Sequence, residues 1–157
     1  MEIRRAGKDD LVGIGRVADA AHWDAYAGLL DPGTIAALLR RDFAPGPVRR
    51  RLLSGGVLVA IEAGRVVGFA DAAVAGDQVR LQALGTDPEN RHARVAARLL
   101  EEVRRLAPAL PVSADVLLGC TPVEGYLEAQ GFVPGEVLES DLFGQLTVAR
   151  RWWLAPR

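Results

Sequence analysis

Three arginines gather where a helix is predicted to begin. Arg91, Arg94 and Arg98 follow Asp87-Pro88, and proline ends a strand because it has no N–H to donate to a neighbouring strand. The first N–H groups of a helix have no partner within the helix, and together with the helix dipole they attract an anion. The arginines add positive charge at the same place. The spacing therefore predicts a site for a phosphate group.

The apolar pattern predicts the elements that position this turn. Val79, Leu81 and Ala83 alternate with polar residues, which is the period of a partly buried strand. From Val95 onward, apolar residues recur mostly at three- and four-residue steps, which is one face of an amphipathic helix that ends at Pro108. The sequence thus predicts a strand, a proline-marked turn and a helix.

The turn resembles the acyl-CoA pyrophosphate loop of the GNAT superfamily of N-acetyltransferases. That loop has Arg or Gln, two residues, Gly, one residue, and then Gly or Ala. Arg91 and Ala96 match the pattern after Asp87-Pro88-Glu89, whereas Arg94 replaces a glycine of the family. His92 also stands where glycine is common. Each of these two side chains either substitutes for the close approach of the backbone to the pyrophosphate or blocks it.

Other segments resemble the same family, in the same order along nearly the whole chain. Residues 56–70 resemble its central hairpin, with a glycine-containing turn between two apolar strands. Residues 125–132 resemble its closing helix, which ends in Gly131-Phe132. Trp23 and Tyr26 resemble the aromatic-bearing end of its first helix.

The resemblance implies an α/β (α+β) fold, a single GNAT-like domain over residues 1–157. It implies a mixed, mostly antiparallel central sheet of about six to seven strands flanked by about four helices. From the residue pattern, helices are expected over about 9–26, 31–41, 95–106 and 122–130, with a helical turn at 48–53 after an interruption at 44–47. Strands are expected at about 2–5, 57–61, 65–74, 78–84, 112–118, 131–137 and 145–154.

The resemblance also implies acetyl-CoA as the cosubstrate and a place for it. Backbone groups at Leu84, Gly85 and Thr86 correspond to those that serve the acetyl and pantetheine portion in the family, and Gly85 is expected at a strand bulge. The candidate pyrophosphate ligands are Arg91, His92, Ala93, Arg94, Val95 and Ala96.

The proton donor of such a reaction has two interpretations here. Many relatives carry a tyrosine five residues before the phenylalanine of Gly-Phe, and that position is Leu127. Tyr126 lies one residue earlier, which on a helix is a rotation of about 100°. Tyr126 is either the general acid through a local shift or a half-buried packing residue.

Several other residues have two interpretations. Trp23 and Tyr26 either line an acceptor pocket or belong to the core. His92 either touches a phosphate, acts as a base or is a solvated loop residue. Trp152 and Trp153 alternate on the last strand, so one is expected in the core and the other on the surface or at a homodimer contact.

Composition narrows the function class. The net charge of −1 gives no general case for nucleic-acid binding. The single cysteine, Cys120, excludes an intrachain disulfide and a multi-cysteine metal site, and we expect it to be a small buried residue. With only two histidines, no metal is expected. No apolar run reaches the ~18 residues that a membrane span needs, so we expect a cytoplasmic protein.

Two functions of different class follow. The first is an N-acetyltransferase that moves an acetyl group from acetyl-CoA to a primary amine of a small molecule or peptide by direct attack. The second is a GNAT-fold ligand-binding or interaction module with impaired catalysis. The departures at His92, Arg94 and Leu127 support the second, and the ordered set of family matches supports the first.

Overall fold

The computed structural model describes residues 1–90 and 93–157. Its elements in chain order are β1 (Glu2–Arg5), η1 (Lys8–Asp10), α1 (Leu11–Tyr26), α2 (Pro32–Phe43), α3 (Pro45–Leu52), β2 (Val57–Glu62), β3 (Arg65–Ala75), β4 (Gln78–Thr86), η2 (Pro88–Asn90), α4 (Ala93–Arg105), β5 (Val112–Leu117), α5 (Thr121–Ala129), β6 (Val133–Leu142) and β7 (Gln145–Leu154). Within this part of the chain, no helix is both long enough and apolar enough to cross a membrane.

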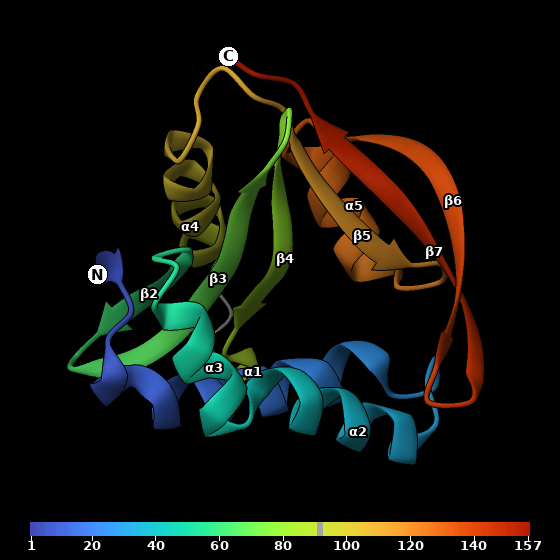
Figure 1. The fold of residues 1–157 in the computed structure, drawn as a ribbon, viewed down its shortest axis with the longest axis horizontal. Coiled ribbons are helices and arrows are strands. Elements are labelled where there is room, and N and C mark those ends of the chain that lie inside the picture. The colour runs from blue at the N-terminus through green and yellow to red at the C-terminus, as the bar shows by residue number, and fades with distance from the viewer. Residues whose placement is uncertain (91–92) are drawn as a thin grey trace.

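The strands form one seven-stranded sheet in the order β1-β2-β3-β4-β5-β7-β6. Neighbouring strands are antiparallel except β4 and β5, which run parallel and are joined by α4 (Figure 1). The predicted mixed, mostly antiparallel sheet is therefore confirmed. The described residues form five α-helices, where the sequence predicted about four.

Successive side chains along each strand point to opposite faces of the sheet, and the apolar ones form a core on each face. Phe69 of β3 faces α1, α2 and α3, where it packs with Ile14 and Val48. Its neighbour Ala70 faces the other side, where α4 and α5 cover the sheet with Leu99 and other apolar residues. Helices α1, α2 and α3 thus cover one face of the sheet, and helices α4 and α5 cover the other. The parallel pair β4–β5 lies within the sheet, between these two helical layers.

Two elements differ from the sequence prediction. Helix α3 begins at Pro45, although residues 44–47 were expected to form a non-helical interruption before a helical turn at 48–53. Proline is compatible with the first turn of a helix because the N–H groups there have no intrahelical acceptor. Strand β6 continues to Leu142, beyond the expected end at residue 137. It is an edge strand with a mostly exposed surface, so its apolar alternation is weak.

The paired tryptophans of β7 face opposite sides, as their spacing predicted. Trp152 is buried in the core beneath α4 and α5. Trp153 is half-buried on the other face, and its indole N–H donates to Glu136 Oε1 at 3.0 Å.

Candidate functional site

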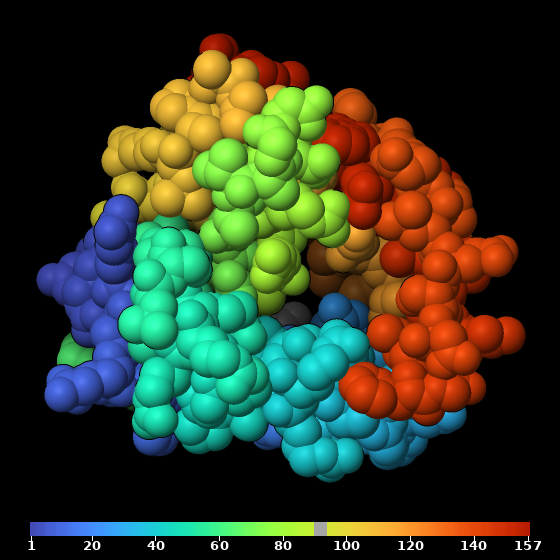
Figure 2. Space-filling model, in the orientation of Figure 1, coloured from blue at the N-terminus to red at the C-terminus, as the bar shows by residue number. Residues whose placement is uncertain are grey.

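The parallel strands β4 and β5 separate partway along their length. Their pairing joins residues 79–81 to residues 112–114, whereas β4 continues to Thr86 and β5 to Leu117. Beyond residue 81, no described residue of β5 pairs with β4. Figure 2 shows a hollow at this place, between β4 and the β5–β7 half of the sheet and above α2. The carboxyl ends of the two strands therefore border an open space in the middle of the sheet.

The end of β4 presents backbone groups to this space. Asp87 N donates to Val67 O at 2.9 Å, and Gly85 lies opposite Phe69, so these residues bond toward β3. Alternate residues of an antiparallel strand bond to opposite sides. The N–H and C=O groups of Leu84 and Thr86 therefore point toward β5, where the described strands offer no ladder partner.

The bulge of β4 lies at Gln82 and not at Gly85. Asp71 of β3 pairs with Ala83, and the next residue, Ala72, pairs with Leu81, so Gln82 is the extra residue. Gly85 itself stays in register. A Cβ atom there would lie 2.6 Å from Phe69 Cε1, so the requirement for glycine comes from this ring. The prediction of a bulge at Gly85 was wrong, because the register between β3 and β4 shifts at Gln82 and Gly85 pairs regularly with Phe69.

The turn after β4 is held by Asp87. One of its carboxylate oxygens accepts the Glu89 N–H at 3.0 Å, and the other accepts from Arg16 of α1 at 2.8 Å. Burial by itself raises the pKa of Asp87, but these two hydrogen bonds and the positive charges of Arg16 and Arg65 outweigh it and leave the pKa below its ordinary value. No local sequence pattern indicated a role for Arg16, because its partner lies 71 residues away.

Helix α4 begins directly after this turn. Arg91 and His92 lie outside the described residues, and Ala93 is the first residue of the helix. The side chain of Val95 is 1% exposed and belongs to the core, so only its backbone faces the turn. Ala96 is half-buried.

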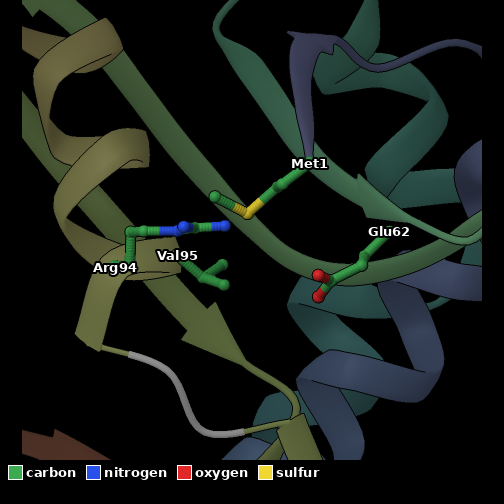
Figure 3. Close-up of a pocket in the computed structure, with 4 residues that line it drawn as sticks. All are labelled: Met1, Glu62, Arg94 and Val95. Atoms are coloured by element: carbon green, nitrogen blue, oxygen red, sulfur yellow. The ribbon is translucent and has the colours of Figure 1, made fainter.

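Arg94 borders a pocket of about 270 Å³ together with Met1, Glu62 and Val95. Figure 3 shows its guanidinium extending from the first turn of α4 toward Met1, with the Glu62 carboxylate across the pocket. A cation and an anion thus share this space. The Arg94 side chain extends toward β1 and β2 and away from the turn that precedes α4.

Helix α5 contributes Tyr126 and Leu127 to the α4–α5 side. Leu127 is 3% exposed and is a core residue, so the family's tyrosine position is filled by packing. Tyr126 is half-buried against the same core. Its hydroxyl oxygen is buried, and no described residue hydrogen-bonds to it. Burial raises the pKa of Tyr126 to about 12.

Trp23 and Tyr26 occupy different environments. Trp23 is 37% exposed and lines a second pocket of about 510 Å³ with the α1–α2 connection and Gln145. Tyr26 packs into a small core with Leu30 and contacts the His22 ring edge-on at 5.4 Å. Of the two, only Trp23 is therefore placed to meet a ligand in that pocket.

Two further buried groups, Asp71 and Cys120, are titratable. Asp71 of β3, opposite Ala83, forms an ion pair with Arg51 of α3. Burial raises the pKa of Asp71, and the nearby Arg51 offsets only part of this shift. Cys120 is buried, and burial raises the pKa of its thiol, so it is a packed thiol and no activated nucleophile. In residues 1–90 and 93–157, no cluster of His, Cys, Asp or Glu is arranged to hold a metal ion.

Solved structures share this fold, although no protein-family model and no curated protein matches the sequence. PaiA N-acetyltransferase from Thermoplasma acidophilum, in complex with coenzyme A, is 19% identical, with a TM-score of 0.78 over 95% of this chain and 96% of its own. A GCN5-related N-acetyltransferase from Rhodopseudomonas palustris is 17% identical, with a TM-score of 0.80 over 98% and 94%. Ribosomal-protein-alanine N-acetyltransferase from Brucella melitensis is 20% identical, with a TM-score of 0.70 over 99% of both chains. The chain therefore has the fold of the GNAT superfamily, as its motifs predicted.

Proposed function

We propose that this GNAT-fold protein is an N-acetyltransferase that uses acetyl-CoA to acetylate a primary amine of a small molecule or peptide. The observation that carries the proposal is the separation of β4 from β5, which leaves the backbone groups of Leu84 and Thr86 facing an open space. An extended amide-bearing chain such as pantetheine can bond to such groups as an additional strand does. The coenzyme A complex of a protein with the same fold supports this choice of ligand.

The cofactor is proposed to run from this space to the start of α4. The N-terminal amides of α4 suit its pyrophosphate, because they have no intrahelical acceptor and lie at the positive end of the helix dipole. Val95 and Ala96 can offer only backbone groups, since Val95 is in the core. Arg91, His92 and Ala93 remain candidate ligands on the sequence resemblance alone.

The chemistry requires two proton movements. The amine nitrogen attacks the thioester carbon and loses a proton, the C–S bond breaks, and the leaving thiolate takes up a proton. Asp71 is the candidate base, because it is a buried carboxylate with a raised pKa opposite Ala83 of β4; its ion pair with Arg51 must open before it takes up the proton. Tyr126 is the candidate acid, because its buried hydroxyl keeps its proton at neutral pH and has no described partner to hold it elsewhere.

The second function, a binding module without catalysis, is favoured by Leu127. That residue fills the family's tyrosine position and is fixed in the core, so the usual donor is missing. Of the two functions, only the acetyltransferase requires acetyl-CoA as a ligand.

Acetyl-CoA should raise the melting temperature of the protein. A ligand at 100 times its dissociation constant adds about 2.7 kcal/mol to the free energy of unfolding. Thermal unfolding with and without millimolar acetyl-CoA measures this, with ATP as a control for nonspecific nucleotide binding. The absence of a shift at millimolar acetyl-CoA would exclude the enzyme and leave the binding module.

The Arg94 guanidinium extends toward Met1 in this structure, and we propose that it turns toward the pyrophosphate when acetyl-CoA binds. Arg94→Gln should then weaken acetyl-CoA binding about tenfold, which corresponds to about 1.4 kcal/mol. The substitution removes a positive charge at the helix start that favours the pyrophosphate. Arg98→Gln is the matched control, because Arg98 lies one turn further along α4 and donates to Met1 O at 3.1 Å. Its loss should change the affinity less than twofold. Isothermal titration of acetyl-CoA measures both variants.

Arg94→Gly distinguishes the two roles of this side chain. Weaker binding identifies Arg94 as a phosphate ligand. Tighter binding would show that Arg94 obstructs the approach of the pyrophosphate and would contradict the prediction.

A further inference from the structure

Arg16 of α1 joins two parts of the fold that are far apart in the sequence. Its Nη1 donates to Asp87 Oδ2 at 2.8 Å, and its Nη2 donates to the Val66 carbonyl oxygen. The Asp87 side chain is 4% exposed and the Arg16 side chain 35%. The guanidinium therefore bridges the start of β3 and the turn that follows β4, with one end reaching solvent.

The close approach of α1 to β3 makes this bridge possible. Gly13 lies one turn before Arg16 on the same face of the helix. A Cβ atom at Gly13 would lie 2.7 Å from Val66 Cγ2, so the helix can approach this closely only without a side chain there. This close approach brings the first two turns of α1 near the Val66 carbonyl oxygen that accepts from Arg16.

Asp87 transmits this contact to the turn before α4. Its backbone N–H donates to Val67 O at 2.9 Å, and its Oδ1 accepts the Glu89 N–H at 3.0 Å. The same carboxylate thus holds Arg16 on one oxygen and the η2 turn (Pro88–Asn90) on the other. Without Arg16, a nearly buried carboxylate loses a charged hydrogen-bond donor, and a buried charge that loses such a partner becomes costly.

We infer that Arg16 is a positioning residue of the cofactor site, which holds Asp87 and the η2 turn so that α4 begins in the direction that its N-terminal amides require. The inference rests on the proposed function in one respect, that the ligand at α4 is the pyrophosphate of acetyl-CoA. It makes α1 part of the cofactor site, although the opposite end of this helix carries Trp23, which lines the second pocket.

The chain offers a matched pair with the same chemistry elsewhere. Arg4 donates to both carboxylate oxygens of Asp10, at 2.7 and 3.0 Å, and Asp10 also accepts the Gly7 N–H at 2.7 Å. The Asp10 side chain is 8% exposed. This pair holds the turn before α1 and lies outside the turn before α4. Breaking either pair should lower the stability of the protein. Only the loss of Arg16 should also lower the affinity for the cofactor.

Arg16→Gln should therefore weaken acetyl-CoA binding about tenfold in isothermal titration, and should raise KM for acetyl-CoA with little change in kcat. Arg16→Lys keeps the charge but cannot donate to Asp87 and Val66 in the fixed geometry of a guanidinium, so it should restore part of the affinity. Arg4→Gln should lower the melting temperature and leave the affinity within twofold. An Arg16→Gln protein with wild-type affinity, or an equal loss of affinity in Arg4→Gln, would overturn the inference.

Hydrogen exchange tests the positioning without any ligand. The Glu89 amide should exchange at least tenfold faster in Arg16→Gln, and in Arg16→Lys to a smaller extent, than in the wild-type protein or in Arg4→Gln. Unchanged exchange at Glu89 would refute the role of Arg16 even if acetyl-CoA binds. Faster exchange in a protein whose wild type binds no acetyl-CoA would support the positioning of the turn and refute the proposed function instead.

Discussion

Tyr126→Phe should lower the turnover number of acetyl transfer by about 10²–10⁴-fold, the usual contribution of a positioned general acid. The same substitution should stabilise the ligand-free protein by about 1 kcal/mol, because it removes a buried hydroxyl that no described residue bonds. The affinity for acetyl-CoA should stay within twofold. Steady-state kinetics, isothermal titration and urea unfolding measure the three quantities.

The turnover number distinguishes catalysis from packing. The buried hydroxyl has no described partner, so its removal should stabilise the protein under either interpretation, whereas only a general acid should lose turnover. Leu127→Met is the control, because it changes the neighbouring core residue of α5 at nearly constant volume and leaves Tyr126 in place. If Tyr126→Phe turns over as fast as the wild type, Tyr126 is a packing residue and the leaving thiolate takes its proton from water or another group.

The pattern of the sequence predicted the elements whose periodicity is strong. The helix after Pro88 and the three-stranded meander before it have a well-marked apolar face, and the structure confirms both. Where the pattern is weak the prediction was poorer. Strand β6 is longer than expected, because an exposed edge strand does not need an apolar residue at every second position.

The site was predictable where backbone position decides it. The resemblance placed candidate backbone ligands at Leu84 to Thr86, and in the structure Leu84 and Thr86 lie beyond the last residue of β4 that pairs with β5. The separation of β4 from β5 was not predicted, because it depends on pairing between strands that are distant in the sequence. Side-chain roles were less predictable. Tyr126 and Leu127 differ by one helical position, and only the packing of α5 shows that Leu127 is the one in the core.

Contacts between distant segments were not predictable at all. Arg16 and Asp87 are 71 residues apart, and no local period relates an arginine in a helix to an aspartate before a proline. The need for glycine at position 85 also comes from a contact with a residue that is distant in the sequence. Nothing in its own strand requires glycine, and the ring that does belongs to Phe69 of the neighbouring strand.

Gly85→Ala should destabilise the protein by about 3 kcal/mol, the upper end of the cost of overpacking a core. The new Cβ would lie 2.6 Å from Phe69 Cε1, which is closer than real Cβ atoms approach other heavy atoms. The ring cannot move aside, because it is 1% exposed and packs edge-on against Phe43 at 5.4 Å. Urea unfolding measures the loss. Gly125→Ala is the control, since a Cβ there meets no atom within 4 Å and alanine favours the helix.

A double-mutant cycle with Phe69→Leu separates the two reasons for a glycine at position 85. The smaller leucine side chain leaves room for the Cβ, so Gly85→Ala should cost much less stability in the Phe69→Leu background than in the wild type. The backbone of Leu84 and Thr86 is displaced by the same clash, so affinity for acetyl-CoA should fall in Gly85→Ala and recover in the double mutant. If stability recovers and affinity does not, then the Cβ itself meets the cofactor, and Gly85 serves both the core and the site. If Gly85→Ala costs no stability at all, the ring of Phe69 does not restrict this position, and only the approach of a ligand can account for glycine there.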